Sequence, residues 1–259
     1  MVENLYTVFT NFKEEFSIDG IAISAPGSIE PGQRYISGNS AIPYIHEFPI
    51  FDELETLFGC PVTIENDARC VALAELWKGN AMDRSNAVVV VIGSGIGGAV
   101  IVNDRIQHGH NAFGGEFGCL ILDGKKTFSE LGTAVTMSKR YNQRTNQNKN
   151  GQEVFELAKS GDIIAMEEVE TFYHYLSIGL WNLQFVSDPS VILLGGGVSQ
   201  HPDLIVEIRN RVNQLKQDIG LNMVEINIEI SKFQNHANMV GAVYAFHNKP
   251  EDYLITQNR

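Results

Sequence analysis

The sequence predicts an α/β fold in two lobes, and three observations lead to that prediction. Short apolar strands alternate with amphipathic helices in the first part of the chain. A glycine-rich hairpin then introduces a different, more apolar region. A short apolar strand ending in a glycine turn recurs near residues 24–27, 93–95 and 195–197. Such turns are typical of α/β lobes whose ligands collect at the carboxyl ends of strands.

The first lobe is expected to span residues 1–86. Apolar side chains recur at spacings of three and four over 4–16, which predicts an amphipathic helix. A strand over 18–24 should stop at Ala25-Pro26-Gly27, because proline and glycine interrupt a ladder. The remaining elements predicted here are a helix over 51–58, a strand over 62–64 and a helix over 68–78.

The second lobe is expected to span residues 87–239. The run AVVVVIGSGIGGAVIV over 87–102 predicts a buried hairpin, because two β-branched segments flank a glycine link. A mostly helical region over 133–186, a strand over 190–194, a helix over 203–215 and a strand over 224–230 should follow. A last helix begins near 237, and the segment from about 240 to 259 is expected to return and complete the first lobe.

The composition excludes several classes of function. A chain of 259 residues with 44% hydrophobic content can bury a large core. Its net charge of −12 disfavours nucleic acids and anionic membranes as partners. A phosphate-bearing ligand would therefore have to be held locally by backbone N–H groups.

The cysteines and the terminal sequence point to the cytoplasm. Cys60, Cys70 and Cys119 are an odd number without CxxC spacing, which argues against a disulfide framework and against a zinc site. The seven histidines likewise form no metal-binding pattern. The N-terminal residues lack the apolar run of a signal peptide, and no stretch has the length of a membrane span. We therefore expect a soluble cytoplasmic protein with no protein-bound metal.

The segment Gly93-Ser94-Gly95-Ile96-Gly97-Gly98 formally matches the dinucleotide fingerprint GxGxxG. That fingerprint requires a following helix, whereas AVIV over 99–102 predicts a strand. A tight turn of this kind can direct N–H groups and a hydroxyl at a phosphate. It can equally be a structural hairpin turn, and the motif alone leaves both interpretations open.

Glu65-Asn66-Asp67 stands between a predicted strand and a predicted helix. Either Asn66 or Asp67 can serve as the helix N-cap. Asp67 can alternatively act as a base for an attacking alcohol, with Asn66 binding neighbouring hydroxyls.

Glu116, flanked by glycines, and Glu130 are carboxylates that can accept paired hydrogen bonds from the hydroxyls of a sugar. Alternatively, each is a solvated glutamate in a loop.

Taken in order, these segments resemble the ROK family of bacterial sugar kinases and sugar-responsive repressors. The resemblance covers nearly the whole chain from about Ile18. SAPG over 24–27, IENDA over 64–68, GSGIGG over 93–98 and GGEFG over 114–118 are similar to family motifs, as are LGGGVS over 194–199 and GAV over 241–243.

The resemblance implies an actin-like ATPase fold of the ribonuclease H-like, hexokinase type. It also implies ATP-dependent phosphorylation of a hexose or β-glucoside, at the 6-hydroxyl, with Asp67 as general base and Mg²⁺ arriving with the nucleotide. Asn39, Asn66, Glu116, Cys119 and Glu130 would contact the sugar. The phosphates and nucleoside would lie against Gly93, Ser94, Gly95, Gly97, Gly195, Gly196 and Gly197.

The sequence departs from the family pattern in two places, and each changes what the resemblance implies. Cys119 takes the place of a common histidine and no cysteine cluster follows, so the family's structural zinc should be absent. The family also begins with a strand ending in DxGGT, which binds phosphate and Mg²⁺, and this sequence contains no such segment. We expect the first lobe to lack its N-terminal strands, through a truncated gene product or with the open strand edge covered in a homodimer.

The alternatives are ranked by these features. An ATP-dependent sugar kinase comes first, and a sugar-binding pseudokinase impaired by the missing DxGGT segment comes second. The hypothesis of a nicotinamide dehydrogenase is supported by GxGxxG alone, and it requires a helix after Gly98. A repressor is disfavoured by the acidic charge and the lack of an N-terminal helix-turn-helix.

Overall fold

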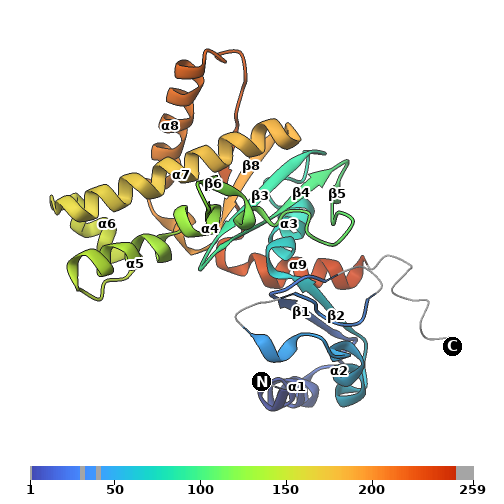
Figure 1. Cartoon of the computed structure of the whole chain (residues 1–259). Coiled ribbons are helices and arrows are strands. Elements are labelled where there is room, and N and C mark those ends of the chain that lie inside the picture. Colours follow the sequence, from blue (N-terminus) through green and yellow to red (C-terminus); the bar gives the residue numbers. More distant parts are fainter. Residues whose placement is uncertain (1, 30–32, 39–41, 249–259) are drawn as a thin grey trace.

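The computed structural model describes residues 2–29, 33–38 and 42–248. A five-stranded sheet lies in the middle of the molecule, and long helices cross it (Figure 1). Helix α9 (Ala237–His247) lies between this sheet and a smaller unit that contains the N-terminus. The predicted α/β class is confirmed. The exact division of the chain into lobes stays a prediction.

The smaller unit is built on two parallel strands, β1 (Ile21–Ala25) and β2 (Val62–Asn66). Helices α1 (Val2–Glu15) and α2 (Ile50–Phe58) pack beside them, close to their predicted limits. The first strand begins three residues later than predicted. Its ladder starts at the pair Ile21–Val62, because Pro61 has no N–H with which to continue it.

The free edge of β1 is bordered by an apolar groove. Among the described strands, β1 pairs with β2 alone. A groove of about 250 Å³ runs between β1 and α1, where Val8 and Phe12 are more than half exposed. This arrangement matches the open edge predicted for the strand.

The larger sheet has the strand order β5-β4-β3-β8-β9. Strands β3 (Ala87–Ile92) and β4 (Ile96–Val102) form the predicted hairpin, and β5 (Arg105–Ile106) extends it at the edge. Strand β8 (Val191–Gly195) runs parallel to β3, and β9 (Ile228–Ile230) runs parallel to β8. The predicted strand over 224–230 is shorter because β8, its partner, begins only at Val191.

Alternate residues of β3 face two different cores. Val88, Val90 and Ile92 pack with the large helical layer. Ala87 and Val89 face the layer that contains α3 (Asp67–Lys78) and α9. A strand buried on both faces needs apolar residues throughout, which accounts for the unbroken run AVVVVI. The large layer comprises α4 (Phe128–Leu131), α5 (Ala134–Thr145), α6 (Gly151–Lys159), α7 (Ile163–Ser187) and α8 (Leu204–Ile219).

Gly97 and Gly98 lie within strand β4, which continues to Val102, so the helix that a nicotinamide dinucleotide site requires after Gly98 is not present. The interpretation of GxGxxG as a dinucleotide fingerprint is therefore wrong. A short hairpin, β6 (Ile121–Asp123) and β7 (Lys126–Thr127), leads into α4 and was not predicted.

Helices α3 and α9 pack in very close contact. A Cβ atom placed on Gly241 would lie 1.7 Å from the carbonyl oxygen of Cys70. Only glycine permits this approach. Helix α9 also contacts β1 and β2, and it ends at His247. The predicted continuation to 259 falls on residues 249–259, outside the described part of the chain.

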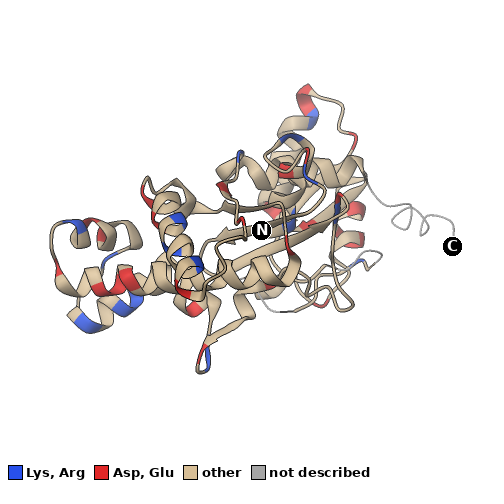
Figure 2. Cartoon of the chain, turned by 90° about the horizontal axis from the view of Figure 1, so that it is seen from above, with Lys and Arg blue, Asp and Glu red and all other residues tan. Residues whose placement is uncertain are grey.

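Charged residues of both signs are interspersed on the helices at the left of Figure 2. There Arg140 and Arg144 of α5 form salt bridges with Glu168 of α7. None of the described helices has the length and apolar character needed to cross a membrane.

The α3–α9 contact provides a test of the fold. Gly241→Ala should destabilise the protein by about 1–3 kcal/mol, because the added methyl group forces the two helices apart. Urea unfolding measures this loss. The control is Met239→Ala on the same helix, where the side chain is 63% exposed and a change within about 0.5 kcal/mol is expected. Equal stabilities for the two variants would contradict the close packing.

Candidate active site

Asp67 lies at the junction between β2 and α3. The N-cap of α3 is Asn66, whose Oδ1 accepts a hydrogen bond from the Arg69 N–H at 3.1 Å. Its Nδ2 donates to the Gly27 carbonyl at 3.0 Å, which ties the strand end to the SAPG turn. Asp67 is therefore the first helical residue and not the cap. Its Oδ1 accepts from the Ala68 N–H at 2.8 Å.

The carboxylates of Asp67 and Glu116 lie in one electrostatic environment. Burial raises the pKa of Asp67, although backbone N–H donors oppose the shift. Burial also raises the pKa of Glu116, where Arg69 lowers it and Asp67 raises it further. Since Asp67 influences Glu116, the structure brings together two of the predicted residues from distant parts of the sequence.

The loop that carries Glu116 is pressed against β4. Gly115 has φ +94°, and a Cβ there would lie 2.4 Å from the Gly98 carbonyl oxygen. At Gly118 a Cβ would lie 2.2 Å from the Ile96 carbonyl oxygen. The glycines of GGEFG thus allow the backbone to approach the hairpin, and this fixes Glu116 next to it.

The glycine turn of the hairpin lies between α3 and α4. A Cβ on Gly97 would be 3.1 Å from the Cβ of Ala68, the residue after Asp67. On the other side, the Ser129 hydroxyl accepts a hydrogen bond from the Ile96 N–H at 2.9 Å. The predicted base and the predicted phosphate turn are therefore neighbours.

The second glycine segment follows β8 at the same end of the sheet. Gly195 is buried, and Gly196 has φ +86° with a hypothetical Cβ only 2.2 Å from the Ile92 carbonyl oxygen. Gly197 has open space where a side chain would be. Because β3 and β8 are parallel, their carboxyl ends place both glycine segments side by side.

A cavity of about 640 Å³ opens beside these glycines. Gly93 and Gly197 line it. Ser94 is exposed in the hairpin turn and does not line this cavity. The rest of the wall comes from the end of β3, from α5 and α6, and from the segment after β8: Ile92, Ala134, Val135, Gly151, Gln152, Phe155, Glu156, Lys159, Val198, Gln200, His201 and Pro202. The mixture of an aromatic ring, apolar side chains and a few polar groups suits a nucleoside.

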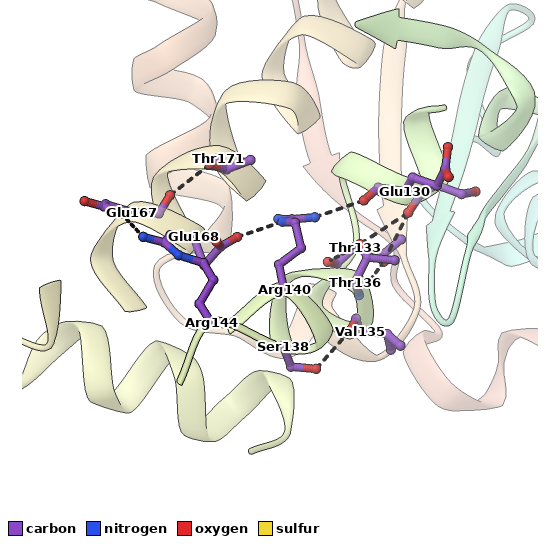
Figure 3. Close-up of polar contacts among 11 residues, drawn as sticks. Glu130, Thr133, Val135, Thr136, Ser138, Arg140, Arg144, Glu167, Glu168 and Thr171 are labelled. Carbon is purple, nitrogen blue, oxygen red and sulfur yellow. Dashed lines mark hydrogen bonds and ion pairs between the residues drawn. The ribbon is translucent and has the colours of Figure 1, made fainter. Parts of the chain in front are cut away.

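Glu130 has a local structural role. Its carboxylate accepts hydrogen bonds from the N–H and hydroxyl of Thr127, and these bonds complete a capping box at α4 and lower its pKa. Figure 3 shows the Glu130 backbone oxygen bonded to Arg140, which also reaches Glu168. The described contacts thus assign Glu130 to the support of α4. Its contact with a sugar stays a prediction.

Cys119 and Asn39 are the two other predicted sugar contacts. Cys119 is an exposed free thiol at the end of a short 3₁₀ turn after Glu116. Asn39 lies outside the described residues, and its contact with a sugar stays a prediction.

Three residues of this region were missed in the sequence. Arg69 is a buried cation, His108 has its pKa lowered to about 4, chiefly by burial, and Ser129 supports the glycine turn. Ser129 and His108 have no local pattern that distinguishes them from loop residues. Arg69 does carry a signal, because an arginine on the small-residue face DARCVALA of a buried helix requires a partner.

The architecture and the glycine turns define an α/β protein of the actin-like ATPase fold. The sequence profile of the ROK family matches residues 1–249, and the chain belongs to this family.

Three known proteins illustrate the relationship. The chain is 32% identical over 243 residues to a β-glucoside kinase of Listeria monocytogenes, which covers 90% of this chain and 81% of the relative. A ROK family protein from Streptococcus pneumoniae, solved with sucrose, has a TM-score of 0.85 and 33% identity over 95% of this chain and 87% of its own. A glucokinase from Streptomyces griseus, solved with glucose and AMPPNP, shares the fold at a TM-score of 0.79 and 21% identity, covering 93% and 85% of the two chains.

The two glycines after β8 allow a matched test. Gly196→Ala should destabilise the protein by at least about 2 kcal/mol, because positive φ and a backbone clash act together. Gly197→Ala should leave the free energy of unfolding within about 0.5 kcal/mol, since its methyl group enters open space. Urea denaturation of both variants measures the difference. A Gly197→Ala protein as unstable as Gly196→Ala would contradict the geometry.

Proposed function

We propose that the protein transfers the γ-phosphoryl group of ATP to the 6-hydroxyl of a hexose or β-glucoside, with Asp67 as general base. One observation carries this proposal. The turn Gly93–Gly97 touches the first turn of α3 on one side and opens into the large cavity on the other. A hydroxyl held at Asp67 and a phosphate held at the glycine turn are thereby adjacent.

The nucleotide side of the site fits ATP in shape. Gly93 and Gly197 have no side chains to crowd a phosphate. The N–H groups of a tight glycine turn can attract anions. The cavity of about 640 Å³ accommodates adenosine, with Phe155 in its wall. No group of three or more potential metal-binding side chains occurs among the described residues. Mg²⁺ would arrive as part of the substrate Mg-ATP.

The reaction follows from this arrangement. The sugar oxygen attacks the γ-phosphorus as the bond from that phosphorus to the β,γ-bridging oxygen breaks, and ADP leaves. The proton of the sugar hydroxyl passes to the Asp67 carboxylate. Phosphoryl transfer proceeds through a loose transition state, so the rate depends mainly on how well the two substrates are positioned.

The sugar side consists of groups suited to vicinal hydroxyls. Glu116 accepts hydrogen bonds, and Asn66 retains donor and acceptor capacity beyond its two internal bonds. Asn39, Cys119 and Glu130 are further proposed contacts. The similarity to a β-glucoside kinase and to a protein solved with sucrose supports a glucose-containing substrate.

Substitution of the base tests the activity. Asp67→Asn should lower kcat for the accepted sugar by about 10²–10⁴-fold, because it removes the proton acceptor and leaves the shape of the site intact. A coupled assay of ADP release across hexoses and β-glucosides measures it. Asp83→Asn, at an exposed aspartate, is the control. Turnover unaffected by Asp67→Asn would exclude the role of base.

Calorimetry separates the two leading alternatives. Sugar binding without turnover and without binding of Mg-ATP would make the protein a sugar-binding pseudokinase. Binding of both substrates with release of ADP supports the kinase.

The pH dependence of the wild type gives a second test. Only the ionised Asp67 carboxylate can accept the proton, so kcat/KM should fall as the pH falls through the pKa of Asp67. Burial raises this pKa above the ordinary value of 3.8, and the acid limb should lie correspondingly higher. The Asp67→Asn variant should lose this limb.

We also propose that the protein is a cytoplasmic homodimer that covers the free edge of β1. The groove between α1 and β1 exposes Val8 and Phe12, and long apolar strand edges favour pairing with another chain. Phe12→Glu should shift the protein to monomer in sedimentation velocity, because it places a charge in this groove. Tyr44→Glu, at a side chain that is 65% exposed outside the groove, is the control.

A further inference from the structure

Arg69 is the largest fully buried side chain of the described residues, although it carries a permanent charge. It lies on the first turn of α3, two residues after Asp67, and its side chain is 2% exposed. Burying a guanidinium is costly unless several acceptors surround it. An arginine here therefore requires an explanation from its contacts.

Those contacts join two loops that are far apart in the sequence. The Nη1 group donates to the Ile29 carbonyl at 2.8 Å, and Nη2 donates to the Ala112 carbonyl at 2.6 Å. Ile29 follows the SAPG turn after β1, while Ala112 precedes the GGEFG loop that carries Glu116. One planar guanidinium thus connects the segments on both sides of Asp67.

The Ala112 end of this connection is held under strain. Ala112 adopts φ +57°, which an alanine seldom does, and its side chain is 1% exposed. A non-glycine residue keeps such a conformation only where its surroundings impose it. The hydrogen bond from Arg69 to the Ala112 carbonyl is one such constraint.

The charge of Arg69 acts on the neighbouring groups. Its Nη1 lies 3.8 Å from Oε1 of Glu65, and it lowers the pKa of Glu65 and of Glu116 against the effect of burial. It also contributes to the low pKa of His108, of about 4, which keeps that imidazole neutral near pH 7. A carboxyl group accepts hydrogen bonds fully at both oxygens only when it is ionised, and Arg69 favours that form at Glu116.

We propose that Arg69 is a positioning residue of the sugar site, holding the Ile29 and Ala112 segments around Asp67 and supplying the positive charge beside Glu116. The inference rests on the proposed function, because it names the residue that organises the same site. It assigns two separable tasks to one side chain. The N–H groups of the guanidinium hold the two loops, and its positive charge favours the ionised form of Glu116.

Two substitutions separate these tasks. Arg69→Lys keeps the charge and loses the planar fork, whereas Arg69→Met loses both. Both should raise KM for the sugar by at least about tenfold, with a smaller effect on kcat, because a charge-assisted hydrogen bond is lost. Arg105→Met, at an exposed arginine on β5, is the matched control and should leave KM unchanged.

The imidazole of His108 reports the charge independently of catalysis. Titration of the wild type by NMR should show a pKa near 4. In Arg69→Met this pKa should rise, because the neighbouring cation is gone, and in Arg69→Lys it should stay low. A purely structural role for Arg69 predicts the same His108 pKa in both folded variants, and that result would overturn the second task.

A second pair of variants leaves Arg69 in place. Ala112→Pro cannot adopt φ +57° and must move its carbonyl away from Nη2, whereas Ala112→Gly tolerates this conformation. The proline variant should raise KM by about tenfold and the glycine variant by much less. These two Ala112 variants test the positioning role of Arg69 even if the Arg69 variants do not fold. Equal KM values for Ala112→Pro and Ala112→Gly would overturn that role.

Failure of this inference is distinguishable from failure of the proposed function. If the wild type phosphorylates no sugar, the proposed function fails. The role of Arg69 is then tested by the calorimetric Kd for glucose and by the His108 titration, which replace KM. If the wild type is active and Arg69→Met folds with an unchanged KM, the inference about Arg69 fails alone.

Discussion

The close approach of α3 to the β3–β4 hairpin is the constraint on which the site depends. The Cβ of Ala68 lies where a side chain on Gly97 would otherwise be, only 3.1 Å from a hypothetical Cβ. A larger residue at either position would separate Asp67 from the glycine turn. On its other face α3 meets α9 more closely still, since a hypothetical Cβ on Gly241 would lie 1.7 Å from the Cys70 carbonyl oxygen. The helix therefore lies between two close contacts, and these contacts set the position of Asp67 at its start.

Electrostatics at the start of α3 reflect a compromise between burial and function. Glu65, Asp67 and Glu116 all have pKa values raised by burial, which disfavours their charged forms. Arg69 opposes this shift at Glu65 and Glu116. At Asp67, backbone N–H groups oppose the effect of burial on the pKa. The residue proposed as base is thereby kept more basic than an ordinary aspartate, while Arg69 favours the ionised form of the proposed sugar ligand Glu116 against the effect of burial.

Local sequence signals predicted much of the fold. The hairpin over 87–102 was recognisable because β-branched runs flanked glycines, and helix α3 because apolar residues recurred with its period. The limits of β1 and β9 were less predictable, since a strand ends where its partner stops offering hydrogen bonds. Pro61 set one limit and the start of β8 set the other. These partners lie about 40 residues away along the chain, beyond the reach of any local pattern.

The sequence by itself determined the family, the order of the glycine turns and the candidate residues Asp67, Asn66 and Glu116, because motif spacing is a property of the chain. It left open whether Asn66 or Asp67 capped the helix, and it treated Glu130 as equivalent to Glu116. Only the tertiary structure placed Asn66 at the cap, Glu130 in a capping box and Arg69 between two distant loops. The physical reason is that hydrogen bonds and burial depend on which segments meet in space, and here those segments are separated by up to 43 residues.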